Sequence, residues 1–552
     1  MSDNEGLEEE TPSSRRRFVE RAGAAAALVL SAPLLPASAS ARAPSRHRRP
    51  GEAAGVRIRA AKRQRRLAES LPRQERNRDE AYPDLRGSFH KCLPQSRFGE
   101  VDVDAFRQLQ RALRTGRPAD FARIPLSSLA TRRLANPQGA LTFNLTGADS
   151  HATRMRAAPA FGSAETAAEM VEVYWHALLR DTPFADYESD PLIETCLRDL
   201  NRLSAPVGPT EGGRITARTL FRGETPGDLV GPYVSQFLWK EVPFGLARID
   251  QRYRVPLAVD FMTSRRDWLR IQRGVAPRGS IAYDDIPRYI YNARSLGEYV
   301  HVDVLSQAYQ FAGLIALAYG ADAFGIFTYE GNPSQAGFTS LGGPDFLDNL
   351  WHVGNLALRA AWYQKWSVHR RLRPEVFAAR VHFTAEGRRT YDVHPDVLGS
   401  RAVRRLQRQN GNAFLPLAFP EGSPTHPSYP AGHAAVAGAC CTVLKAFLNE
   451  DFVIPDPVVA SRDGRSLLPY RGPDLTLRNE INKLASNISL GRDLAGVHYR
   501  SDGIDGILVG EQVALSHLAD VSRTYNENFE GFTLTTFDGS RVLIAGGCVY
   551  DI

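Results

Sequence analysis

The chain has 552 residues, of which 43% are hydrophobic and 23% charged, proportions typical of a soluble globular protein large enough for two cores. Its net charge of +7 is modest for this length and gives no reason to expect nucleic acid as a partner. The five cysteines are too few for a disulfide framework, and no CxxC or Cys/His spacing indicates zinc or an iron–sulfur cluster.

The N-terminus reads as a targeting segment. The run Ser14-Arg15-Arg16-Arg17-Phe18-Val19 resembles a twin-arginine signal, an apolar stretch follows over residues 22–36, and small residues up to position 43 offer cleavage sites. We therefore expect residues 1–43 to direct export to the periplasm or beyond, with no membrane association once they are removed. A basic disordered arm is the alternative. Residues 44–80 are expected to form a basic flexible linker.

Beyond the linker, the pattern of apolar residues is mostly helical. Asp104 is placed to cap one helix that ends at Gly116, and Ser163 is placed to open another. Residues 308–319 are apolar nearly all round, which indicates a buried core helix too short to cross a bilayer. Further helices are expected over residues 345–364, 434–444 and 481–488.

Strand signals are few. Residues 532–537 and 541–544, joined through Asp538-Gly539, predict a terminal β-hairpin. The expected fold class is therefore mainly α, with helical bundles and a minor C-terminal β-hairpin. We divide it into an N-terminal helical region, residues 81–330, and a C-terminal helical region, residues 331–552.

The first of three segments with chemical interest contains a lysine and an arginine eight residues apart. Only six of the 68 basic residues are lysines, and Lys365 is one of them. Arg373 immediately precedes Pro374, which stops a helix and lets the arginine side chain turn away from the helical stripe. Taken alone, such a pair is more often a solvated basic face.

The second segment is Pro427-Ser428-Tyr429-Pro430-Ala431-Gly432-His433, which enters the alanine-rich helix expected at 434–444. Gly432 allows close approach of its backbone amide to a ligand, and a helix N-terminus is a ready anion site. The positive end of the helix would lower the pKa of His433. An ordinary turn explains this segment alone equally well.

The third segment places Arg492 and His498 six residues apart across Gly496, which implies a bend that lets both face one centre. Together the three segments supply a lysine, two arginines, a glycine amide and two histidines. That set suits a tetrahedral or trigonal-bipyramidal oxyanion, so the site either transfers phosphoryl groups or holds vanadate.

These motifs resemble the vanadium-dependent haloperoxidases, which share their site with the type 2 phosphatidic acid phosphatase superfamily. The motifs match the bromoperoxidase branch typified by marine algae more closely than the bare superfamily pattern. It covers roughly residues 80–540 and extends upstream through Asn136-Pro137-Gln138, Gly147-Ala148-Asp149-Ser150-His151 and residues 165–184 and 231–237. The resemblance implies two four-helix bundles and a homo-oligomer.

The resemblance also implies a role for each residue. His498 would bond vanadium, and one vanadate would be bound per subunit. Lys365, Arg373 and Arg492 would neutralise its oxygens, with a hydrogen bond from the Gly432 amide. The remaining roles are those of His433 as acid/base, of Lys365 in polarising bound peroxide, and of Trp362 and His426 near the halide. The expected substrates are hydrogen peroxide, bromide or iodide, and a small organic acceptor.

One position departs from the family pattern. Ala431 stands where the family usually has a serine whose hydroxyl donates to a vanadate oxygen. Three alternatives remain: an acid phosphatase with His498 as nucleophile, an inactive relative, and an exported protein that binds polyanions through residues 42–66.

Overall fold

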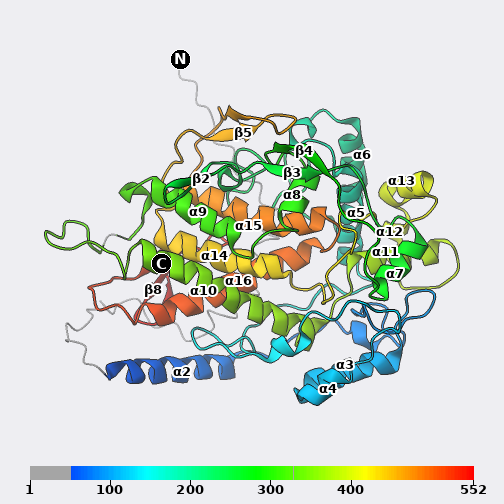
Figure 1. The fold of residues 1–552 in the computed structure, drawn as a ribbon, viewed down its shortest axis with the longest axis horizontal. Helices are drawn as coiled ribbons and strands as arrows, with labels where there is room; N and C mark the ends of the chain where they lie inside the picture. The colour runs from blue at the N-terminus through cyan, green and yellow to red at the C-terminus, as the bar shows by residue number, and fades with distance from the viewer. Residues whose placement is uncertain (1–50, 327) are drawn as a thin grey trace.

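The computed structural model describes residues 51–326 and 328–552, so the expected signal segment lies outside the described residues. The described part is mainly helical, as the sequence predicts (Figure 1). Its α-helices are α2 (Glu52–Ser70), α3 (Val103–Thr115), α4 (Pro118–Ala122), α5 (Ala164–Leu179), α6 (Pro191–Leu200), α7 (Arg265–Gln272), α8 (Ala293–Tyr299), α9 (Gln307–Ala318), α10 (Gly343–Tyr363), α11 (Pro374–Ala385), α12 (Pro395–Leu398), α13 (Arg401–Asn410), α14 (Gly432–Phe447), α15 (Leu477–Leu494) and α16 (Arg500–Val521).

The strands are short and antiparallel. Three separate pairs are formed by β1 (Val242–Phe244) with β2 (Ala247–Ile249), β3 (Tyr253–Pro256) with β4 (Tyr283–Arg288), and β5 (Val458–Ala460) with β6 (Leu467–Pro469). The expected terminal hairpin is present as β7 (Phe532–Thr535) and β8 (Arg541–Ala545), and β9 (Cys548–Asp551) adds a third strand to it.

Helix α14 lies at the centre of the C-terminal region, packed against α10, α15 and α16 (Figure 1). Small residues allow α14 and α16 to approach closely. A Cβ on Gly438 would lie 2.0 Å from the carbonyl oxygen of Ile507, and one on Gly510 would lie 2.0 Å from that of Ala435. The close crossing fixes the N-terminus of α14 relative to the segment that enters α16.

A smaller apolar cluster positions the end of α10. Phe106 and Leu109 of α3 belong to it, together with Phe89 and Trp366, all of them buried. The Trp366 ring packs edge-on against Phe89 at 5.6 Å between ring centroids. This cluster anchors the segment that carries Lys365.

Two expectations, the cap of α3 and the structure of the linker, need correction. Asp102, not Asp104, caps α3, because the Asp102 carboxylate accepts from the backbone N–H of Ala105 at 2.9 Å. Ser163 does cap α5, as expected. Within the expected flexible linker, Glu52–Ser70 is helical, and Gln64 donates to Asp520 of α16 at 3.2 Å. The boundary at residue 330 stays a prediction.

Among the described residues, no helix combines the length and apolar character needed to span a membrane.

Candidate functional site

Lys365 lies at the end of α10, where the helix widens into a π-helical turn over Gln364–His369. Such turns are frequent at functional sites. The lysine is fully buried, and its Nζ donates to the carbonyl oxygens of Pro427 at 2.8 Å and Ser428 at 2.7 Å. Burial, reinforced by the charge of Arg373, lowers the pKa of Lys365 well below its ordinary value. The second segment is thereby bonded directly to the first.

Arg373 turns toward the same centre because it lies in extended backbone just before Pro374, which opens α11. Its Nη1 donates to His498 Nε2 at 2.9 Å and to the carbonyl oxygen of Val497 at 2.6 Å. Its Nη2 donates to His426 Nδ1 at 3.0 Å. Burial lowers the pKa of Arg373 to about 9. This guanidinium therefore joins the first segment to the third.

His498 is oriented by Asp502, four residues further on at the start of α16. The two are joined by a 2.8 Å hydrogen bond between His498 Nδ1 and Asp502 Oδ2. A carboxylate only accepts, so Nδ1 carries the proton and Nε2 keeps a lone pair. The Nε2 contact agrees, because Arg373 can only donate to it. Burial, with the charges of Arg373 and Lys365, lowers the pKa of His498 well below its ordinary value.

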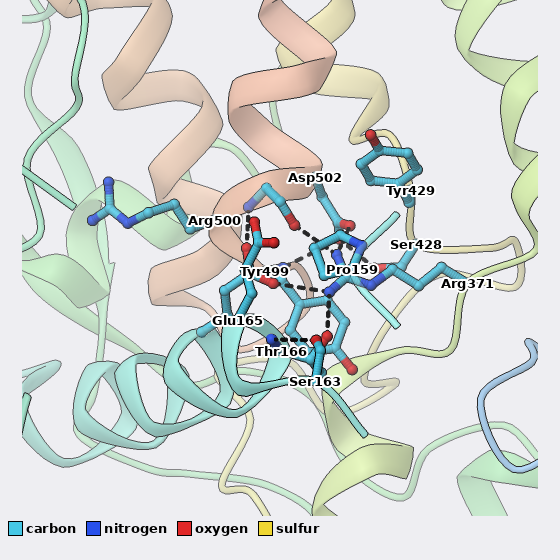
Figure 2. Close-up of polar contacts among 12 residues, drawn as sticks. Pro159, Ser163, Glu165, Thr166, Arg371, Ser428, Tyr429, Tyr499, Arg500 and Asp502 are labelled. Carbon is cyan, nitrogen blue, oxygen red and sulfur yellow. Dashed lines mark hydrogen bonds and ion pairs between the residues drawn. The ribbon is translucent and has the colours of Figure 1, made fainter. Parts of the chain in front are cut away.

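Asp502 is itself held in place by a buried polar network (Figure 2). Arg371 donates to Asp502 Oδ1 at 2.8 Å and to Glu169 of α5 at 2.8 Å, and the Ser428 hydroxyl donates to Asp502 Oδ2. Asp502 ends the motif that begins before His498, but neither it nor Arg371 was given a role from the sequence. The spacing of four residues between His498 and Asp502 was a usable signal for the first of them.

His433 lies in the first turn of α14, as expected, and the helix begins at Gly432. Its Nε2 donates to Asp303 Oδ1 at 3.2 Å. Burial lowers the pKa of His433, the charge of Arg492 lowers it further, and Asp303 opposes both. The expected direction is confirmed, although the causes are burial and Arg492. Asp303 lies between α8 and α9, and sequence reasoning missed it.

Arg492, in the last turn of α15, is buried and only partly satisfied. One Nη donates to the carbonyl oxygen of Val300 at 2.6 Å, while its buried Nε has no hydrogen-bond partner within the described chain. The guanidinium lies 5.4 Å from the centroid of the Phe419 ring. Burial lowers the pKa of Arg492 to about 10. A buried donor without a partner is costly, which indicates a missing acceptor.

Trp362 and His426 lie side by side at the edge of this group. Their ring centroids are 4.7 Å apart, and Trp362 Nε1 donates to the carbonyl oxygen of Ala135 at 3.3 Å. Burial lowers the pKa of His426 well below its ordinary value, and the charge of Lys365 adds to this. Both residues therefore contribute to the site as uncharged groups.

Lys365, Arg373 and Arg492 fit an oxyanion. Within the described part of the chain, none of the three forms an ion pair with a carboxylate. The charge of Arg492 lowers the pKa of Lys365 and of Arg373, and the charge of Arg373 also lowers the pKa of Lys365. Three buried cations without a directly bonded carboxylate are unfavourable unless an anion joins them, although the more distant Asp502 and Asp303 offset part of their charge. Lys365 also keeps a third N–H beyond the two that are bonded. Vanadate would supply further hydrogen-bond acceptors and negative charge to these three side chains.

Ala431 is the one position where this fit is incomplete. It is the fully buried N-cap residue of α14, and it makes no side-chain hydrogen bond to the helix. A serine at this position would provide a hydroxyl at the end of the helix that carries His433.

The comparisons with known proteins point to one family. A family model described as the VCPO second helical-bundle domain matches residues 354–527, which contain all three segments. The chain is 35% identical to the vanadium-dependent bromoperoxidase of Ascophyllum nodosum, with 85% of this chain and 90% of that protein covered. It is 34% identical to the vanadium-dependent bromoperoxidase of Corallina pilulifera, over 84% of this chain and 92% of that protein.

A solved structure agrees with these relatives. The homohexameric second vanadate-dependent bromoperoxidase of Ascophyllum nodosum superposes with a TM-score of 0.85 at 29% identity, covering 93% of this chain and 94% of that one. With the fold, the three cationic residues and the similarity to relatives over most of their length in agreement, the chain belongs to the vanadium-dependent bromoperoxidase family.

Proposed function

We propose that this protein is a vanadium-dependent haloperoxidase that uses hydrogen peroxide to oxidise bromide or iodide to the level of hypohalous acid. The oxidised halide then halogenates small organic acceptors. The observation that carries the proposal is the His498 lone pair at Nε2, directed at a buried group of cations that form no ion pair with a carboxylate of the described residues. The named relatives support this activity over that of a phosphatase using the same site.

Vanadate would bond to His498 through Nε2, one per subunit. Lys365, Arg373, Arg492 and the Gly432 amide would hold its oxygens. When bound, vanadate supplies a Lewis acid that activates peroxide toward halide without a change in the oxidation state of vanadium. Because Arg373 Nη1 donates to Nε2 in the structure, this guanidinium has to shift its hydrogen bond to an oxyanion oxygen.

His433 is suited to take a proton from incoming peroxide. Asp303 accepts from Nε2, so Nε2 carries the proton in the neutral ring and Nδ1 is free to accept another. The lowered pKa of His433 keeps the ring neutral near neutral pH, and Asp303 stabilises the cation formed on protonation. His433 is therefore proposed as the acid/base.

Lys365 provides positive charge to the site. Lys365 is buried and forms no ion pair with a carboxylate of the described residues, so a bound anion would stabilise its charged form. Trp362 and His426, uncharged and adjacent, are proposed to line the approach of the halide.

Two further features are proposed on separate grounds. The homohexameric relative supports a homo-oligomer. The twin-arginine-like run at residues 14–19 supports export to the periplasm or the extracellular space.

The activity is tested with purified protein that has been stripped of oxyanions and reloaded with orthovanadate. We expect bromination of monochlorodimedone that requires hydrogen peroxide, bromide and vanadate, and that is lost in His498→Ala. Absence of bromide and iodide oxidation, together with hydrolysis of a phosphate ester by the vanadate-free protein, would assign the site to a phosphatase instead.

A further inference from the structure

Helix α13 presents a row of arginines, none of which belongs to the site described above. Arg404, Arg405 and Arg408 lie three, four and seven residues after Arg401, a spacing that places all four on one face of the helix. This face, with Arg202, Thr195 and Trp175, lines an open cavity of about 460 Å³. The cavity lies between α13, α5 and α6, and α13 is at the periphery of the molecule (Figure 1).

The arginines on α13 are not neutralised. Among the ion pairs of the described residues, none involves any of the four. Arg405 Nε is buried and has no hydrogen-bond partner in the described chain. Like charges three and four residues apart destabilise a helix, so a bound anion would relieve an unfavourable arrangement.

The cavity is held in shape without any ligand. Asp199, fully buried, accepts from Trp175 Nε1 at 3.0 Å and from the backbone N–H of Arg401 at 2.8 Å. The same carboxylate accepts from Arg202 Nε at 2.8 Å. The carbonyl oxygen of Gly399 then accepts from both Arg202 and Arg404. Asp199 therefore ties α5 to the start of α13 and fixes the positions from which the arginines project.

We propose that this cavity is a binding site for a ligand that carries two or more phosphate or sulfate groups. Guanidinium groups match the edges of tetrahedral oxyanions by paired hydrogen bonds. Five guanidinium groups around one cavity exceed what a single phosphate or sulfate can satisfy. The carboxylate of Asp199 offsets only one of the five charges, that of Arg202, so the cavity remains strongly positive. The site is separate from the vanadate residues and adds a binding function to the proposed enzyme.

The test uses the full-length, vanadate-loaded protein, so that its oxyanion site is already filled. Binding of two probes is measured by isothermal titration calorimetry: inorganic triphosphate and a trisulfated heparin disaccharide. We expect one probe bound per chain. The double variant Arg404→Gln/Arg408→Gln should weaken the Kd by at least about tenfold, because each lost guanidinium removes charge-assisted hydrogen bonds.

The matched control is Arg107→Gln/Arg114→Gln, which removes two exposed arginines from α3. Its Kd should stay within twofold of the parent. Bromination rates and circular dichroism should be unchanged in both double variants, which separates loss of binding from loss of fold. Binding of one probe alone would identify the ligand as a phosphate or a sulfate. Equal weakening in both double variants, or no binding of either probe at millimolar concentration, would refute the proposal.

Discussion

Replacing Asp502 by asparagine tests how His498 is prepared for vanadium. The Asp502 carboxylate accepts from His498 Nδ1 at 2.8 Å, which leaves the lone pair on Nε2. An asparagine of the same shape can donate its amide N–H to Nδ1. That bond favours the opposite tautomer, with the proton on Nε2 where vanadium would bind.

The size of the effect follows from the contacts that are lost. Changing a residue that orients a metal-bound histidine costs about 10- to 100-fold in affinity, so the Kd for vanadate should rise by that factor. Arg371 also loses one of its two buried carboxylate partners, although Glu169 remains. Breaking a buried ion pair outright costs about 3–5 kcal/mol; with asparagine still offering an oxygen, we expect about 2 kcal/mol of lost stability.

The assay is an equilibrium titration of stripped protein with orthovanadate, followed by the recovery of bromination. Asp505→Asn is the matched control, because Asp505 is another buried carboxylate of α16, bonded to Tyr429 at 2.9 Å and to Arg156 at 3.0 Å. It should lose stability without a large change in vanadate affinity. A folded Asp502→Asn protein with a Kd within threefold of the parent would refute the tautomer argument.

Three further predictions concern single residues. Ala431→Ser should tighten vanadate binding by about tenfold, since a hydrogen bond to a charged group contributes about 1.5–3 kcal/mol. In the same titration, the control Ala437→Ser within α14 should leave the Kd for vanadate unchanged, and an equal gain in affinity in both variants would contradict the reasoning. Asp303→Asn removes the group that raises the pKa of His433, so the imidazole ring stays neutral to lower pH. The acid limb of the pH profile of kcat/KM for peroxide should therefore move to lower pH. Movement to higher pH would be inconsistent with His433 as the base. Lys91→Met breaks the buried ion pair with Glu375, whose atoms lie 2.9 Å apart. The free energy of unfolding, measured by urea denaturation, should fall by about 3–5 kcal/mol while vanadate affinity is retained. Unchanged stability would argue against an energetic role for the pair.

The sequence could predict the centre of the site because each segment carried a local backbone signal. Pro374 indicated that the backbone at Arg373 is not helical, and Gly432 indicated the start of α14. These signals depend on neighbouring residues only, so they are readable without knowledge of the fold. Asp502 could have been found in the same way, from its spacing to His498.

Asp303 could not be predicted in this manner. It lies in a connection between two helices, 130 positions before His433, and only the tertiary packing brings the two within 3.2 Å. The short strand pairs were not predicted either, because three-residue strands such as β1 and β2 are too short to show a periodicity of apolar residues. The helix over Glu52–Ser70, by contrast, could have been predicted, because its alanine, arginine and leucine residues are strong helix formers.

A crystal structure of the vanadate-loaded protein, with vanadium located by its anomalous scattering, would test the proposed role of His498. We expect a single vanadium site per chain, bonded to His498 Nε2, with Lys365, Arg373 and Arg492 contacting the vanadate oxygens and Asp502 still bonded to Nδ1. Vanadium bound at another residue, or at His433 with His498 Nε2 still bonded to Arg373, would contradict that role.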